Sequence, residues 1–265
     1  MFVEIILSFI TQVVSTIGAI FLFGFLIALC NRRFYSNFGS KSMFVCYATG
    51  FIGTPVHELS HALFCLLFGH KIVKIKLFQI NVEDGTLGYV HHTYNPKNIY
   101  QRIGNFFIGV APIIVISTLL YLFAYLIMPS TLSDISMLAK SISFNKGAGE
   151  FFNMVYQILY TFFSVATTWQ WWVFVIVGMF FALHMTLSGA DIKGALGGLL
   201  FVLPCLLIVD VILGLVGGGA LSSFDSFMFS IGAVLDVFLL LALIISSMAC
   251  IMSFIYRIIF RKFID

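Results

Sequence analysis

Charged residues are scarce in this sequence of 265 residues. Asp, Glu, Lys and Arg together make up 9% of it, and hydrophobic residues make up 61%. Soluble domains carry about a quarter charged residues. A chain with so few charges cannot cover a surface that faces water. The composition therefore excludes an ordinary soluble domain and favours a membrane protein with several helices.

Two other absences narrow the function. No CxxC pair occurs, so the cysteine pattern indicates neither a thiolate metal site nor a disulfide framework, and burial in apolar surroundings is the expected role of all five: Cys30, Cys46, Cys65, Cys205 and Cys250. The formal charge of +3 is spread along the chain without a basic block, which argues against a nucleic acid partner.

Apolar runs of roughly 20 residues or more are long enough to cross a membrane. They predict an all-α polytopic membrane protein with about six transmembrane helices. The predicted spans are residues 5–30, 43–68, 104–128, 170–190, 194–216 and 227–256. All of them belong to one predicted domain, residues 1–265. An even number of spans places both termini on one side. The larger share of Lys and Arg favours the cytoplasm for that side, although the pair Arg32-Arg33 argues the other way.

A more polar segment, residues 69–102, follows the second predicted span. It is rich in β-branched residues and contains the turn sequence Glu83-Asp84-Gly85, so it predicts a small membrane-associated β-hairpin over residues 71–94. His91 and His92 are neighbours on its second strand. Adjacent strand residues face opposite ways, so these two are interpreted as surface histidines.

The second predicted span contains the motif His57-Glu58-Leu59-Ser60-His61, called HELSH below. Its two histidines lie four residues apart, so a helix presents both on one face, where they can bind one metal ion. Zinc lowers the pKa of a bound water to about 7, and the adjacent glutamate can take that water's proton. Charged groups inside a span cost about 2.5–3.5 kcal/mol each. A zinc ion bound by these residues would offset this cost. The alternatives to a zinc site are a helix kink lined by hydrogen-bonded histidines, or a proton relay.

A catalytic zinc needs a third protein ligand. Asp191, just after the fourth predicted span, is favoured as this ligand if the helix is broken around Gly189, as the glycines there allow, and His184 is the alternative ligand. In a continuous helix His184 would share the face of Asp191 and lie about 10 Å deeper, where it could bind substrate or stabilise an oxyanion. A solvated charge beside Lys193 is the competing interpretation of Asp191.

Other polar residues in predicted spans carry less information. Asn105 could hydrogen-bond a substrate or orient the site, although the small residues around it favour close helix packing. Asp210 and Asp236 are carboxylates within predicted spans, and no catalytic role is assigned to either.

The order of these parts resembles the site-2 protease family of intramembrane metalloproteases. The resemblance covers roughly residues 43–200, with spans 5–30 and 227–256 as peripheral additions. It implies His57, His61 and Asp191 as zinc ligands and Glu58 as general base. The chain departs from the family's Asn-Pro segment and Leu-Asp-Gly, because it has Ala190-Asp191-Ile192-Lys193-Gly194 instead. This departure suggests a divergent branch.

Two functions are therefore expected from the sequence. The first is an intramembrane zinc metalloprotease, with Zn²⁺ as cofactor, the lipid bilayer around it, and a membrane protein or membrane peptide as substrate. The second is a non-proteolytic membrane protein, either a metal or proton transporter or a pseudoprotease scaffold. It is motivated by His184, Asp210 and Asp236, which could make a polar path. The oligomeric state and the identity of the substrate are left open.

Overall fold

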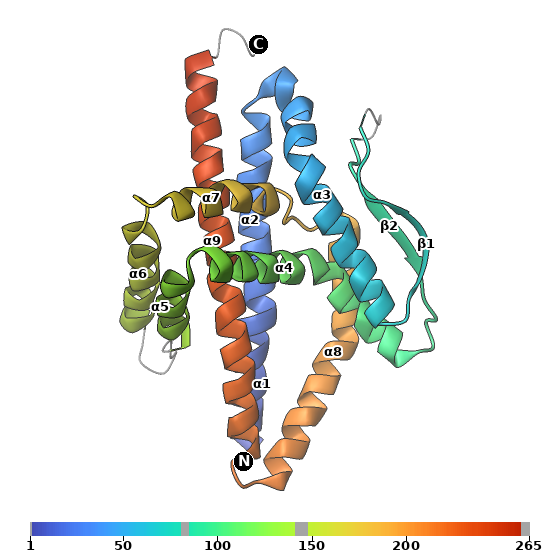
Figure 1. Ribbon diagram of the computed structural model, residues 1–265. Coiled ribbons are helices and arrows are strands. Elements are labelled where there is room, and N and C mark those ends of the chain that lie inside the picture. The colour runs from blue at the N-terminus through green and yellow to red at the C-terminus, as the bar shows by residue number, and fades with distance from the viewer. Residues whose placement is uncertain (1, 81–84, 141–147, 261–265) are drawn as a thin grey trace.

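Two long apolar helices run side by side through the protein. The structure is a computed structural model that describes residues 2–80, 85–140 and 148–260. The first long helix is continuous over α1 (Phe2–Gln12), the π-helical η1 (Val13–Gly18) and α2 (Ala19–Ser36); the second is α9 (Ala220–Phe260). α2 packs along α9, and α4 crosses both of them at a steep angle (Figure 1).

The other helices surround this pair. They are α3 (Ser42–Leu67), preceded by the 3-10 turn η2 (Gly39–Lys41), then α4 (Ile99–Ile127), α5 (Pro129–Lys140), α6 (Ala148–Ser164), α7 (Trp169–Ala182) and α8 (Gly189–Val216). α4 packs against both α3 and α8. This contact joins the HELSH helix to the helix that carries Asp191.

Four of the described helices are long and apolar enough to cross a membrane, namely Phe2–Ser36, Ile99–Ile127, Gly189–Val216 and Ala220–Phe260. The pair Phe152–Ser164 and Trp169–Ala182, bent by 112°, would make a fifth. The helices are those of a helical membrane protein, as predicted, but the count of six spans is not confirmed. α3 is absent from this group because the polar HELSH residues lower its mean hydropathy.

The predicted fourth span, residues 170–190, was wrong in its extent. α7 ends at Ala182, and α8 begins at Gly189. Ser188 caps α8, because its hydroxyl accepts a hydrogen bond from the N–H of Asp191. This local bond starts a new helix where the apolar run had suggested continuation.

The two long helices run parallel to each other. Near the beginning of both, the Ser8 hydroxyl donates to Asp225; near the end of both, the Asn37 amide donates to the Ser253 hydroxyl at 2.9 Å. The described ends of the chain therefore lie at opposite ends of this pair (Figure 1). This differs from the expectation of both termini on one side, which followed from an even number of spans.

The predicted hairpin is confirmed. β1 (Lys71–Lys76) pairs antiparallel with β2 (Tyr89–Thr93), and a register shift lies between Ile72 and Lys74. Glu83 and Asp84 of the predicted turn lie outside the described residues. The hairpin lies beside α3 (Figure 1), and β1 is largely exposed.

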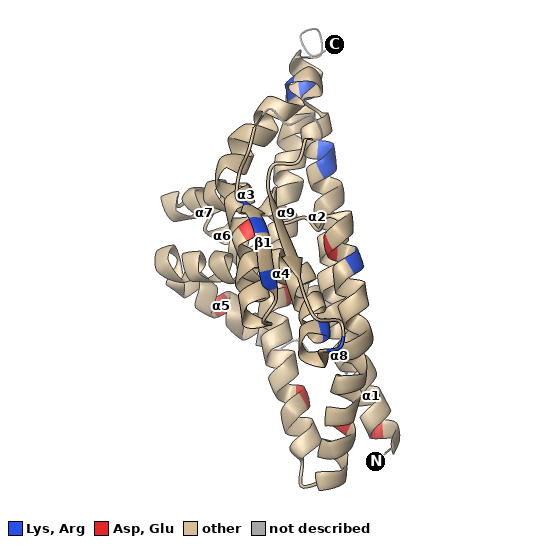
Figure 2. Ribbon diagram, turned by 90° about the vertical axis from the view of Figure 1, so that its right-hand side faces the viewer, with Lys and Arg blue, Asp and Glu red and all other residues tan. Residues whose placement is uncertain are grey.

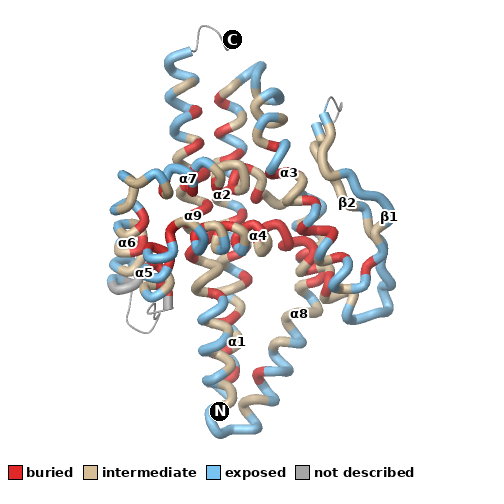
Figure 3. Tube along the Cα trace, in the orientation of Figure 1, coloured by how far each residue is buried: buried red, intermediate tan, exposed pale blue. Residues whose placement is uncertain are grey.

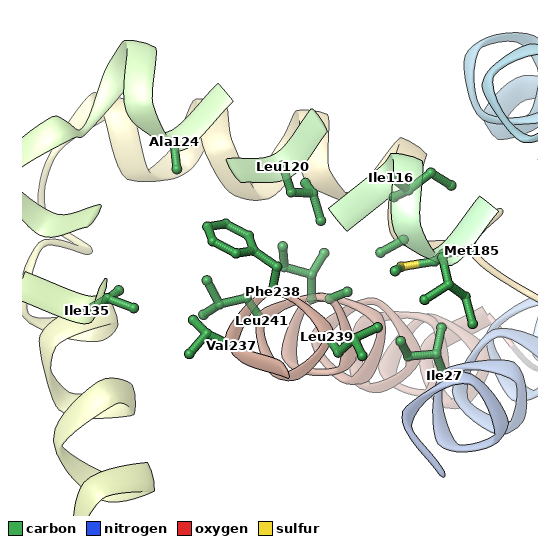
Figure 4. Packing of buried hydrophobic residues seen from close by; sticks show 14 of the residues in the cluster. Ile27, Ile116, Leu120, Ala124, Ile135, Met185, Val237, Phe238, Leu239 and Leu241 are labelled. Atoms are coloured by element: carbon green, nitrogen blue, oxygen red, sulfur yellow. The ribbon is translucent and has the colours of Figure 1, made fainter. Parts of the chain in front are cut away.

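The larger of two clusters of buried apolar residues forms the core of the part of the chain that the structure describes. Ile116 and Leu120 of α4 meet Phe238 of α9, and Ile27 of α2 packs into the same cluster (Figure 4). Figure 3 shows buried residues concentrated where α4 crosses the long helices, and exposed residues along the outer parts of α1, α8 and α9. In a bilayer, lipid tails are as apolar as the side chains of the helices, so burying apolar surface between helices gives no hydrophobic gain. Close packing therefore stabilises the contacts between these helices. α2 and α9 share this core, although the sequence placed them outside the region that bears the site.

Candidate metal centre

The two histidines of HELSH face each other on α3. Their Nε2 atoms lie 3.1 Å apart. The Nδ1–H of His57 donates to the backbone carbonyl of His184 at 2.9 Å, and the Nδ1–H of His61 donates to the carbonyl of Ile108 at 2.8 Å. A carbonyl oxygen can only accept, so these bonds fix the proton on Nδ1 in both rings. Each Nε2 then points a lone pair at the other.

Two facing lone pairs need a proton or a cation between them. In tetrahedral zinc sites with Zn–N distances of 2.0–2.1 Å, ligand atoms lie about 3.3 Å apart. The spacing of the two Nε2 atoms is close to this value. Metal-binding histidines commonly donate the other ring N–H to a carbonyl, which sets the tautomer and the ring orientation. Both histidines have this arrangement.

Asp191 completes a group of three possible ligands. Its Oδ1 lies 3.3 Å from Nε2 of His61, and its Oδ2 lies 4.0 Å from Nε2 of His57. The potential ligand atoms of these three residues all lie within 4.8 Å of one another. The structure thus brings together the three residues that the resemblance implied as a zinc set.

The break between α7 and α8 determines how Asp191 is held. Asp191 lies in the first turn of α8, and its Oδ2 accepts a hydrogen bond from the N–H of Ser188 at 2.7 Å. In return, the N–H of Asp191 donates to the Ser188 hydroxyl at 3.1 Å. This reciprocal pair is a capping box. It orients the carboxylate so that Oδ1 faces the histidines.

Glycines bring α8 close to α4 at this point. A Cβ on Gly109 of α4 would lie 2.5 Å from the carbonyl oxygen of Asp191, and a Cβ on Gly198 of α8 would lie 2.1 Å from the backbone nitrogen of Phe106. No larger residue fits at either position without moving the backbone. Gly109, one of the small residues predicted to favour packing, and Gly198 therefore set the distance between α8 and the carbonyl that holds His61.

Glu58 is buried beside the histidines, with 7% of its surface exposed. The segment that leads into β2 covers it. A Cβ on Gly88 would lie 2.6 Å from Cγ of Glu58 and 2.9 Å from Cγ2 of Thr54. Only a glycine leaves room there for the glutamate, so the start of β2 forms one wall around it.

His184 is not one of the three grouped residues. It lies in the break after α7, so the continuous helix that would have placed it on the face of Asp191 is not present. Its ring Nε2 contacts the hydroxyls of Tyr35 at 3.2 Å and Thr49 at 3.1 Å, while its carbonyl accepts from His57. It holds a potential ligand in place through its backbone.

Asn105 lies on α4, one helical turn before Ile108, and is half-buried. Its backbone packs against Gly198 of α8. This position fits the packing interpretation, and it is also close in sequence to the carbonyl that binds His61. The structure adds three groups that sequence reasoning missed, namely the carbonyls of Ile108 and His184 and the small residue Gly88. Backbone atoms have no side-chain signature that could reveal them.

Asp210 lies in a different part of the protein. Its Oδ1 accepts a hydrogen bond from the amide of Gln12 on α1 at 3.1 Å, and Gln12 also donates to Asp225 at 2.7 Å. Among the described residues, Oδ2 of Asp210 and Oδ1 of Asp236 are buried without a hydrogen-bond partner. No described hydrogen bond connects these carboxylates to the histidines.

Comparison with known proteins also points to a zinc site. Residues 50–162 match the model of a family described as "Putative zincin peptidase". The match covers HELSH, the hairpin and α4, ends before Asp191, and takes in less than half of the chain. It supports a zinc metallopeptidase and identifies zinc as the cofactor. No curated protein and no solved structure matches the chain.

Proposed function

We propose that the protein is an intramembrane zinc endopeptidase of the HExxH type, similar to the site-2 proteases. It would hydrolyse peptide bonds of membrane-embedded or membrane-adjacent substrates. One observation carries the proposal: the Nε2 atoms of His57 and His61 face each other at 3.1 Å with both Nδ1–H groups bound to carbonyls, and the carboxylate of Asp191 completes the group.

His57, His61 and Asp191 would hold the zinc ion. Bound there, zinc supplies a water of lowered pKa and polarises the peptide carbonyl. The carboxylate of Glu58 takes a proton from the attacking water and delivers it to the nitrogen of the leaving amine. Gly88 and Thr54 confine the Glu58 side chain, so that its carboxylate stays beside the ligand group. The capping box of Ser188 keeps Asp191 from rotating away.

The hairpin supports a mode of substrate binding. β1 is paired on one side with β2, in a sheet of two strands within the described residues, and Val73 is 63% exposed. An unwound substrate segment can add to such a strand edge through main-chain hydrogen bonds. β2 in turn leads directly to the wall around Glu58. Asn105 is a candidate for contact with the bound segment, and His184 is a positioning residue for His57.

The decisive experiment compares Glu58→Gln with wild type, both purified in detergent and incubated with a panel of single-span apolar peptides. The variant should keep one equivalent of zinc at the HELSH group and lose cleavage by at least a hundredfold, since general base catalysis contributes about 10²–10⁴-fold. Glu4→Gln, on the exposed beginning of α1, is the matched control and should cleave like wild type. Cleavage by the Glu58 variant at the wild-type rate would refute the proposal.

Ligand assignment needs a second comparison. His57→Ala and Asp191→Ala should both lose the zinc held at this group. Loss in the first variant but retention in the second would make Asp191 a non-ligand and would move attention to His184.

A transport function is favoured by one observation only, the buried oxygens of Asp210 and Asp236 that have no described hydrogen-bond partner. Buried carboxylates inside a membrane often mark ion or proton paths. Zinc-dependent proton flux in proteoliposomes that is abolished by Asp210→Asn and unaffected by Glu58→Gln would favour this alternative.

A further inference from the structure

A second cluster of potential metal ligands lies where α3 meets the hairpin. Cys65 lies on α3, four residues after His61 and so on the same helical face. His70 follows the end of α3, and His92 belongs to β2. The Cys65 sulfur and one ring nitrogen of each histidine all lie within 4.8 Å of one another. None of the three belongs to the HELSH group.

His70 has the same arrangement as the HELSH histidines. It is 4% exposed, and its Nε2–H donates to the backbone carbonyl of Gln101 at 2.8 Å. Its Nδ1 therefore carries a lone pair, which points at Nδ1 of His92, 3.0 Å away. Burial lowers the pKa of both His70 and His92 from the usual value.

Neighbouring residues hold these two histidines in place. The ring of Tyr94 stacks on His70 with centroids 5.0 Å apart. The Gln101 side chain donates to the carbonyl of Gly69 at 2.7 Å and accepts from the N–H of Asn95 at 2.6 Å, which fixes the residue that orients His70. Cys65 is fully buried, and its carbonyl accepts from the N–H of His70 at 2.8 Å. The three groups are thus held in place by the fold.

We propose that Cys65 Sγ, His70 Nδ1 and His92 Nδ1 bind a second zinc ion. One thiolate and two imidazoles are typical zinc ligands, and about 3.3 Å between ligand atoms is the tetrahedral spacing. Three protein ligands leave the fourth position of the ion open. The bound ion would fasten β2 to the end of α3. It thereby also fixes the segment before β2, where Gly88 covers Glu58.

The competing interpretation is a single proton shared by the two Nδ1 atoms, with Cys65 as an ordinary buried residue. The two interpretations differ in zinc stoichiometry and in spectroscopy. A thiolate bound to Co²⁺ gives a ligand-to-metal charge-transfer band, whereas the HELSH group contains no sulfur ligand and cannot give one.

The experiment measures bound zinc, and the spectrum after Co²⁺ replacement, on the full chain in detergent. Wild type should hold two zinc ions and show the band. His57→Ala should hold one ion and keep the band; Cys65→Ser should hold one ion and lose it. Cys46→Ser, also on α3 but outside the cluster, is the matched control and should behave like wild type.

Absence of the band from both wild type and His57→Ala would overturn the second site. That result would leave the proposed peptidase intact if Cys65→Ser still holds zinc and cleaves. Conversely, two zinc ions with the band but without any Glu58-dependent cleavage would support the second site and refute the peptidase.

Discussion

At the scale of single residues, the chemistry depends on backbone groups as much as on the motif. The spacing of HELSH predicted that His57 and His61 share a face, and the structure brings their Nε2 atoms within 3.1 Å. The carbonyls that orient them come from positions 47 and 127 residues away in sequence, which no local pattern could reveal. The interpretation of His92 as a surface histidine was wrong for the same reason, since the hairpin brings it beside His70, where it is half-buried.

Gly88 gives the most specific prediction at this scale. Gly88→Ala places a Cβ 2.6 Å from Cγ of Glu58, so the glutamate must move. A loss of about 1.4 kcal/mol in transition-state stabilisation corresponds to a tenfold lower kcat/KM, and we expect at least that effect with zinc content unchanged. Peptide cleavage assays measure it. Gly149→Ala, where nothing lies within 4 Å of the added Cβ, is the control; equal rates for both variants would contradict the role of Gly88.

Ser188 tests how Asp191 is oriented. Ser188→Ala removes the hydroxyl that caps α8, which costs about 1 kcal/mol of helix stability. Because the cap also holds the carboxylate, zinc affinity should fall by roughly tenfold, in the range for residues that orient ligands. A competition titration with a zinc indicator measures this affinity. Ser188→Thr keeps the hydroxyl and should restore most of it; an unchanged affinity in the alanine variant would show that the cap does not orient the ligand.

At the scale of elements, the hairpin and most helices follow from composition and periodicity, whereas the glycines allow a break before α8 without fixing its position. Residues 170–190 are apolar almost throughout, so hydropathy favours one span, and the hydrogen bonds of Ser188 instead begin a new helix. α3 shows the opposite case. Its motif residues lower its hydropathy, yet it packs against α4 and carries the site.

The crossing of α4 and α8 can be tested with two adjacent glycines. In Gly198→Ala the added Cβ would lie 2.1 Å from the backbone of Phe106, so the helices must separate. Overpacking of this kind costs about 1–3 kcal/mol. We expect a lower Tm in detergent and weaker zinc binding, since Asp191 moves with α8. Gly197→Ala meets nothing within 4 Å and should match wild type. Equal Tm values for the two variants would contradict this packing.

At the scale of the whole molecule, the parallel course of the two long helices constrains the topology. Arg32 and Arg33 lie at the end of α2, and Lys41 lies directly before α3. Arg257 lies at the neighbouring end of α9, since the rings of Phe38 and Tyr256 are in contact with centroids 5.1 Å apart. Around the N-terminus and the turn between α8 and α9, Figure 2 shows acidic but no basic positions. Basic residues beside spans favour the cytoplasm.

We therefore expect the C-terminus in the cytoplasm and the N-terminus on the opposite side, as an odd number of spans requires. Reporter fusions active on only one side of the membrane, attached at each end in turn, measure this. Replacing Arg32, Arg33 and Lys41 by Gln should weaken the preference, because these charges flank the first span directly. The same substitution at Lys74, on the exposed β1, is the control and should not change it. If both reporters respond on the same side, α1–α2 and α9 cannot both span the membrane in the parallel arrangement. The expectation from six spans, that both termini lie on one side, would then hold.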